Sequence, residues 1–173
     1  DNTKANIDEL FVDWLFDSAR QEGDTTYIRD EDSGYFVLYF KSVTDKSFRL
    51  PNVRHILISS NDVNDTVART EAKAKAEALL DEFLAGEITD EAFAELAKAN
   101  SADNAEAGGL YENILPGDMV ATFEAWCFDE TRAIGDTGIV ESDYGYHVMY
   151  FSGYGDVYLD HEVREAKKTE DYN

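Results

Sequence analysis

Two segments of this 173-residue chain carry the same pattern of residues. Residues 14–17 read WLFD and residues 126–129 read WCFD, while residues 34–40 read GYFVLYF and residues 145–151 read GYHVMYF. The offset between the copies is 112 residues in the first run and 111 in the second, so the first copy carries one extra residue before its last strand. We interpret this pattern as an internal duplication. The copies differ in chemistry, because the second has His147 where the first has Phe36.

Composition narrows the class of protein. Hydrophobic residues make up 43% of the chain and aromatic residues 13%, which is enough for a packed core. The formal net charge of −22 repels phosphates and anionic lipids, so we expect no nucleic-acid partner. We recognise no transmembrane segment and no signal peptide in this chain. Cys127 is the single cysteine and stands where the first copy has Leu15, which favours a packing role.

The first copy reads as a helix followed by a hairpin. Ile7, Leu10 and Trp14 lie at helical spacing, which predicts a helix over residues 6–16. Strand-like runs follow over residues 26–28 and 35–40. We expect Pro51, which lacks a backbone N–H, to interrupt strand pairing and mark a boundary.

The rest of the chain mixes strands and helices in an order typical of the α+β class. The pattern predicts strands over 53–58, 137–140 and 146–151, and helices over 65–85 and 90–100. A third helix is expected from Asp118, with Met119, Phe123 and Trp126 on one side. From Val157 onward the tail predicts a charged amphipathic helix. We therefore expect an antiparallel sheet surrounded by helices.

Five separated phrases resemble the parvulin-type (PpiC, rotamase) peptidyl-prolyl isomerases. They are RHILI at 54–58, SAD at 101–103 with AGGL at 107–110, PGDMV at 116–120 with Phe123-Glu124, GDTG at 135–138, and YGYHV at 144–148. The resemblance spans about residues 52–152, and the phrases occur in the family's order.

The resemblance implies roles for particular residues. The catalytic set would be His55, Asp103, His147 and Ser142, and the substrate-binding set would be Leu110, Met119 and Phe123, with no metal and no cofactor. Two features depart from the family. The segment from Leu110 to Met119 is one residue longer than the common pattern. The loop after His55 lacks a basic cluster, so we expect no preference for phosphorylated substrates.

The resemblance also divides the chain. Residues 1–50 would be a partial, degenerate parvulin-like repeat that matches only the C-terminal half of the domain. Residues 52–154 would be the isomerase domain, and residues 155–173 a charged helical tail or connector. The partial repeat could be the remnant of a neighbouring domain, or it could borrow its missing half from a partner chain, giving a homo-oligomer through residues 1–50.

The function implied is that of a peptidyl-prolyl cis/trans isomerase that assists folding of proline-containing, exported proteins. Its partners would be unfolded or proline-containing polypeptides, and its location extracytoplasmic, secreted or attached to the cell surface. The alternative is a non-catalytic chaperone or scaffold module that binds extended polypeptides, since Phe36 indicates that a copy without the histidine is tolerated. A hydrolase using Asp103 and a histidine is disfavoured, because no motif places a serine or cysteine nucleophile.

Overall fold

A computed structural model describes residues 7–42, 47–60 and 62–171 of the chain. The polypeptide divides between Asp45 and Lys46 into two compact units.

The first unit consists of one helix and one hairpin. It contains α1 (Glu9–Leu15), β1 (Thr25–Asp30) and β2 (Gly34–Tyr39), and the two strands pair antiparallel. Asp8 caps α1, because its side chain accepts a hydrogen bond from the backbone of Leu10. No side chain among residues 7–42 is fully buried, so this unit has little hydrophobic core of its own.

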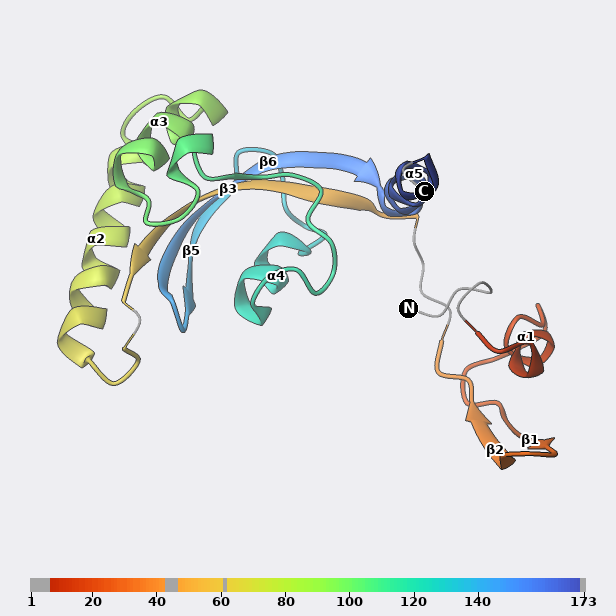
Figure 1. The fold of residues 1–173 in the computed structure, drawn as a ribbon. Coiled ribbons are helices and arrows are strands. Elements are labelled where there is room, and N and C mark those ends of the chain that lie inside the picture. The colour runs from red at the N-terminus through yellow and green to blue at the C-terminus, as the bar shows by residue number, and fades with distance from the viewer. Residues whose placement is uncertain (1–6, 43–46, 61, 172–173) are drawn as a thin grey trace. The chain divides into compact units, whose positions relative to one another are not determined.

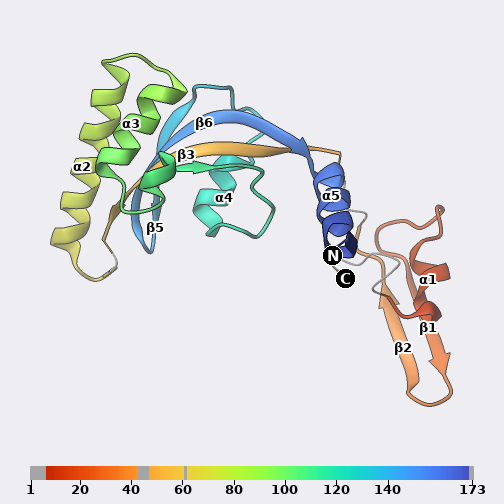
Figure 2. The same ribbon diagram turned by 45° about the horizontal axis from the view of Figure 1, so that its top comes forward.

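The second unit is an antiparallel four-stranded sheet with helices on both faces, which confirms the α+β class. Its elements are β3 (Arg49–Ser59), α2 (Thr66–Leu84), α3 (Asp90–Asn100), η2 (Ala105–Ala107), β4 (Leu110–Tyr111), α4 (Ala121–Cys127), β5 (Thr137–Ser142), β6 (Gly145–Val157) and α5 (Tyr158–Asp171). The strand order is β4-β3-β6-β5. The long strands β3 and β6 run side by side through the centre (Figures 1 and 2).

The expectation for Pro51 is confirmed in part: strand pairing is irregular at this position, but no boundary lies there. Strand β3 begins at Arg49 and runs through Pro51, which is buried and lies opposite Tyr154 of β6. The pairing register shifts on both sides of this position, between Arg49 and Pro51 and again between Asn52 and Val53. Such irregularities accommodate a residue that cannot donate to the ladder. Both central strands are therefore longer than the hydrophobic runs that predicted them.

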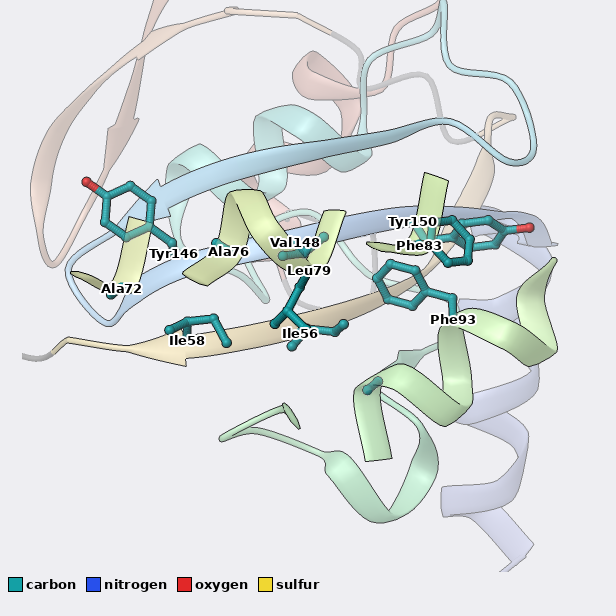
Figure 3. Packing of buried hydrophobic residues seen from close by; sticks show 11 residues of the cluster. Ile56, Ile58, Ala72, Ala76, Leu79, Phe83, Phe93, Tyr146, Val148 and Tyr150 are labelled. Atoms are coloured by element: carbon teal, nitrogen blue, oxygen red, sulfur yellow. The ribbon is translucent and has the colours of Figure 1, made fainter. Parts of the chain in front are cut away.

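One face of the sheet packs against α2 and α3 (Figure 3). This cluster contains Ile56, Ile58, Tyr146, Val148 and Tyr150 from the strands and Ala72, Ala76, Leu79, Phe83, Phe93 and Ala97 from the helices. Both helices begin close to their expected first residues. The side chain of Asp65 accepts hydrogen bonds from the first turn of α2, and that of Thr89 from the first turn of α3. These two helices leave the other face of the sheet for α4.

The second face packs against α4 and the loop before it. Val53, Val140, Met149 and Phe151 of the strands meet Ile114, Phe123 and Cys127. Burial raises the pKa of the Cys127 thiol to about 12, which fits a packing role. The helix was expected from Asp118 but begins at Ala121. The backbone N–H of Asp118 donates to the carbonyl of Leu115 in a turn, and Val120 is extended, so Met119 precedes the helix.

The charged tail forms α5, as the pattern from Val157 predicts. Within the described ranges, no helix has both the length and the apolar character needed to cross a membrane.

Candidate active site

Two buried histidines lie side by side on the α4 face of the sheet. His55 comes from β3 and His147 from β6, and each side chain is almost fully buried. Their Nδ1 atoms are 3.0 Å apart, and the rings stack with a centroid distance of 5.2 Å. Both histidines lie on the same face of the sheet. Leu57 is directly opposite His147, and His55 is two residues from Leu57 along β3, so all three side chains point to one side.

Ser142 continues the polar network from the histidine of β6. Its Oγ lies 2.7 Å from Nε2 of His147 and also accepts a hydrogen bond from the backbone N–H of Tyr144. Ser142 is the last residue of β5, next to the turn that leads into β6.

Asp103 closes the other end of the network. Its Oδ2 lies 3.1 Å from Nε2 of His55, in a close electrostatic contact that is too poorly aligned for a regular hydrogen bond. The hydroxyl of Tyr111 donates to the same oxygen at 3.0 Å. The side chain of Asp103 is 43% exposed, so this end of the network reaches solvent.

The partners fix a consistent set of proton positions. A proton on Nε2 of His55 faces the Asp103 carboxylate, which leaves Nδ1 of His55 as an acceptor. The proton on His147 then lies on its Nδ1, and its Nε2 accepts from the Ser142 hydroxyl. Both imidazoles are neutral in this arrangement, and the His55 Nε2 proton faces the carboxylate without a regular hydrogen bond.

Burial favours the same neutral state. It lowers the pKa of His147 to about 4, an effect that the neighbouring His55 reinforces. Burial also lowers the pKa of His55, although Asp103 opposes this shift. The pKa of Tyr111 is raised to about 12, first by burial and then by Asp103, so its hydroxyl remains a donor near neutral pH.

Local structure holds Asp103 in place. The Ser101 hydroxyl accepts from the backbone of Leu57 in β3 and donates to the carbonyl of Asp103 at 2.6 Å. The loop returns to β3 at Gly109, whose φ is +68° and whose carbonyl accepts from the backbone of His55. A Cβ at Gly109 would lie 2.1 Å from the carbonyl oxygen of His55, so only glycine permits this approach.

An aromatic and apolar wall surrounds the histidines. The ring of Phe123 meets both edge to face, with centroids 5.2 Å from His55 and 5.3 Å from His147. Half-buried Met119 packs on the same cluster, as does Tyr111, whose ring centroid lies 5.4 Å from that of His55. The structure therefore brings together His55, Asp103, His147, Ser142 and Phe123, with Met119 at their margin.

Leu110 does not join this group. In β4 it lies opposite Arg54, whose guanidinium pairs with Asp90 of α3, so Leu110 belongs to the other face of the sheet. Tyr111 takes the expected place beside the histidines. No motif identified Tyr111, and only the register of β4 against β3 could have done so.

A cleft of about 420 Å³ lies next to the network at Ser142. Its lining comes from Val63, Arg69, Val120, Ala121, Thr122, Glu141, Ser142 and Asp143. Met119 and Phe123 do not line this cleft, although Met119 directly precedes Val120. The cleft touches the polar network at Ser142 and lies between the N-terminal ends of α2 and α4.

Solved structures of low sequence identity share this fold. A PpiC-type peptidyl-prolyl cis-trans isomerase domain superposes with a TM-score of 0.54 at 17% identity, covering 65% of this chain and 97% of that one. The peptidyl-prolyl isomerase ESS1 from Candida albicans gives 0.51 at 18% identity, covering 75% and 94%. At such identity these likenesses bear on the fold alone.

Curated relatives of higher identity are also found. A chaperone SurA of Hahella chejuensis is 33% identical over 126 residues, which is 70% of this chain and 27% of that protein. A foldase protein PrsA 1 of Listeria innocua is 35% identical over 99 residues, which is 56% of this chain and 28% of that protein. The chain thus spans about a quarter of the length of these relatives.

The family model of the PPIC-type PPIASE domain matches residues 36–152. This stretch holds both histidines, the loop of Asp103 and the aromatic wall, and it exceeds half of the chain. The chain belongs to the PpiC-type, or parvulin-type, peptidyl-prolyl isomerase family.

Proposed function

We propose that this chain is a peptidyl-prolyl cis/trans isomerase that assists protein folding. One observation carries the proposal: a buried histidine pair leads to a half-exposed carboxylate beside an apolar wall. In this proposal His55, His147, Ser142 and Asp103 are the catalytic network. Met119, Phe123 and Tyr111 bind the substrate proline.

The reaction requires no bond cleavage. An X-Pro peptide bond isomerises slowly because rotation disrupts amide resonance, at a barrier of roughly 20 kcal/mol. A catalyst needs to bind the twisted amide more tightly than either planar form. The apolar wall would hold the proline ring while the preceding residue rotates.

Asp103 would act on the electronic structure of the amide. Amide resonance places negative charge on the carbonyl oxygen, and a nearby carboxylate disfavours that charge. The C–N bond then loses double-bond character and rotates more easily. The Tyr111 hydroxyl and Nε2 of His55 would keep the Asp103 carboxylate in position for this role.

The neutral histidines would act as positioning residues. A charged pair at a 3.0 Å separation would repel, and the burial that lowers both pKa values keeps the pair uncharged near pH 7. The Ser142 hydroxyl fixes the tautomer of His147, which in turn orients His55 toward Asp103.

The test measures cis/trans exchange of short Xaa-Pro peptides by NMR. The full chain is compared with its His147→Phe variant, the change that the first copy already carries at Phe36. We expect catalysis by the full chain and a reduction of at least about tenfold in the variant, because loss of the His147 hydrogen bonds leaves His55 and Asp103 less well oriented. Circular dichroism checks that both proteins are folded.

Lack of catalysis by either protein would contradict the proposal. If labelled unfolded polypeptides still bound, the chain would instead be a non-catalytic chaperone or scaffold module. Equal catalysis by both proteins would remove the histidine pair from the mechanism and leave the fold as the only link to isomerisation.

We propose unfolded or proline-containing polypeptides as substrates and an extracytoplasmic location. The resemblance to bacterial extracytoplasmic foldases supports both, as do relatives named as a chaperone and a foldase. Fractionation of cells into cytoplasmic and extracytoplasmic fractions would test the location, and recovery of the protein in the cytoplasmic fraction alone would contradict it.

An assembly through residues 1–50 is a separate proposal. The small core of the first unit favours a partner; a second copy of the chain is one alternative for that partner, and a different polypeptide is the other. A monomeric mass in multi-angle light scattering would contradict the homo-oligomer.

A further inference from the structure

One face of the β1–β2 hairpin presents large side chains to solvent. Tyr27, Tyr35, Val37 and Tyr39 are between 61% and 80% exposed. They lie on one face, because Tyr27 pairs with Val37 while Tyr35 and Tyr39 lie two positions from Val37 along β2. Contiguous exposed apolar surface of this kind marks a binding site more often than an ordinary surface.

The opposite face is already covered. Phe36 meets Phe11 of α1 edge to face at 5.1 Å, and Phe40, just beyond β2, meets Trp14 at 6.5 Å. In the part of the chain that is described, β2 pairs with β1 alone. The hairpin therefore offers both an exposed face and an open strand edge.

The second unit contains a hairpin of the same internal geometry. Thr25 pairs with Tyr39 in the first hairpin, and Thr137 pairs with Tyr150 in the second. The strand register of β1 against β2 is the same as that of β5 against β6 from these pairs to the turn. The preceding turns match as well, since Gly23 donates to the carbonyl of Phe40 as Gly135 does to that of Phe151, both at 2.9 Å.

The helix-to-strand connections also match. The Arg20 guanidinium lies over the ring of Trp14 at 4.2 Å, and that of Arg132 lies over Trp126 at 4.0 Å. Each arginine also donates to the backbone carbonyl of the tryptophan that it covers. The equivalence of the two segments is thus one of structure as well as sequence.

In the second unit the equivalent face is covered. Tyr146, Val148 and Tyr150 correspond to Tyr35, Val37 and Tyr39, yet they are at most 8% exposed. They pack under α2 and α3, as Figure 3 shows, and the edge of β6 pairs with β3. The strand β3 and the helices α2 and α3 thus supply what the first unit lacks.

We propose that the face of Tyr27, Tyr35, Val37 and Tyr39 is a docking surface for the N-terminal half of a second parvulin-type domain. The partner is a polypeptide segment with an apolar strand, which adds to the edge of β2, and an amphipathic helix, which covers the exposed face. Residues 7–42 are the C-terminal half that receives it.

Charge identifies the partner helix further. Arg69 of α2 contacts Glu141 of β5 at 2.5 Å, and the first unit has Arg29 at the position equivalent to Glu141. The partner helix therefore carries a carboxylate where α2 has Arg69. A second copy of this chain does not fit, because its Arg69 would face Arg29 and its β3 is already paired with its own β6.

The test extends the full chain at its N-terminus with a second copy of residues 47–118 that carries Arg69→Glu. This probe supplies a strand and helices with the required charge at high local concentration. Amide hydrogen exchange by NMR then reports on residues 34–39. We expect exchange to slow by at least about 100-fold relative to the unextended chain, as for a strand that enters a sheet.

Two variants control the experiment. The same extension with Arg69 retained should give protection about fivefold weaker, because like charges then meet across the interface. Val37→Asp in the first unit should abolish the protection by placing a charge under the helix, while leaving exchange in β3 unchanged. Unprotected residues 34–39 in both extended chains, with β3 still protected, would overturn the proposal.

The unextended chain supplies a further outcome. Self-association that is detected by sedimentation and lost in Val37→Asp would assign the face to a second copy, which also overturns the proposal. Absence of isomerase activity would not contradict the docking proposal, because hydrogen exchange of residues 34–39 does not depend on catalysis.

Discussion

At the scale of single residues, the candidate site depends on a proton network that stays uncharged. His147 has a pKa of about 4 in the folded chain against an ordinary value of 6.5. The unfolded state therefore binds more protons between these two pH values, and the free energy of unfolding falls as the pH is lowered through this window. Above pH 6.5 this contribution is complete and constant.

We expect His147→Phe to reduce the pH dependence of stability. Urea unfolding at pH values from 7 to 4.5 measures the free energy of unfolding. This free energy should fall more steeply for the wild-type chain than for the variant, by up to about 1.4 kcal/mol per pH unit for one proton. The acidic groups are shared by both proteins, so the difference isolates the histidine. Parallel curves would mean that His147 is already protonated in the fold or exposed to solvent.

Tyr111 holds the Asp103 carboxylate through its hydroxyl group. Its hydroxyl donates to the Asp103 carboxylate, and hydrogen bonds to charged groups contribute about 1.5–3 kcal/mol. Tyr111→Phe should lower kcat/KM for an Xaa-Pro peptide roughly tenfold, as expected for about 1.4 kcal/mol of lost transition-state stabilisation, and urea unfolding checks that the variant still folds. Tyr27→Phe, on the exposed hairpin face, is the control and should leave kcat/KM unchanged. Full activity in Tyr111→Phe would show that Asp103 needs no such partner.

Among the structural elements, the connection from α3 to β4 is decisive for the site, because its backbone lies directly against the backbone of β3. Gly108 and Gly109 both have positive φ, and Gly109 packs directly on the backbone of His55. The connection from α3 to β4 therefore sets the distance between Asp103 and the histidine pair.

We expect Gly109→Ala to destabilise the chain by more than about 2 kcal/mol, from backbone strain and the displaced strand. Catalysis should fall as well, because Asp103 moves with the loop. Gly86→Ala is the matched control: a Cβ there meets its nearest atom at 3.6 Å, so stability should change by less than about 0.5 kcal/mol. Urea unfolding of both variants measures the difference. Equal stability of the two would contradict the tight approach at Gly109.

At the scale of the whole molecule, the two units differ in how much they bury. Side chains of the second unit form two clusters on opposite faces of one sheet, whereas residues 7–42 contain no fully buried side chain. An isolated two-stranded hairpin is marginally stable in water. The first unit should therefore open far more readily than the second.

Native-state hydrogen exchange of the unmodified chain tests this difference. Amides of β1 and β2 should exchange at least about 100-fold faster than those of β3 and β6, since local opening follows the number of buried contacts. Equally slow amide exchange in both hairpins would mean that the exposed face of the first unit is covered without a partner, and would contradict the proposed docking surface.

Much of the fold follows from local sequence. The caps at Asp65 and Thr89 and the apolar spacing in α2 and α3 predict these helices closely, because capping and periodicity act within a few residues. The separated phrases around His55, Asp103 and His147 also identify the family and most of the residues that meet at the site. The chemistry of the site was therefore readable before its geometry.

Three features were decided only by the tertiary structure. The pairing of β4 with β3 places Tyr111 beside the histidines and Leu110 on the other face, the turn at Asp118 delays α4 to Ala121, and β3 passes through Pro51 at a register shift. The sequence by itself determined the helices, the class of fold and the set of reactive groups, because these depend on short-range preferences. The choice of face and register belongs to the tertiary structure, because a one-residue shift in strand pairing reverses every side chain and only distant contacts fix it.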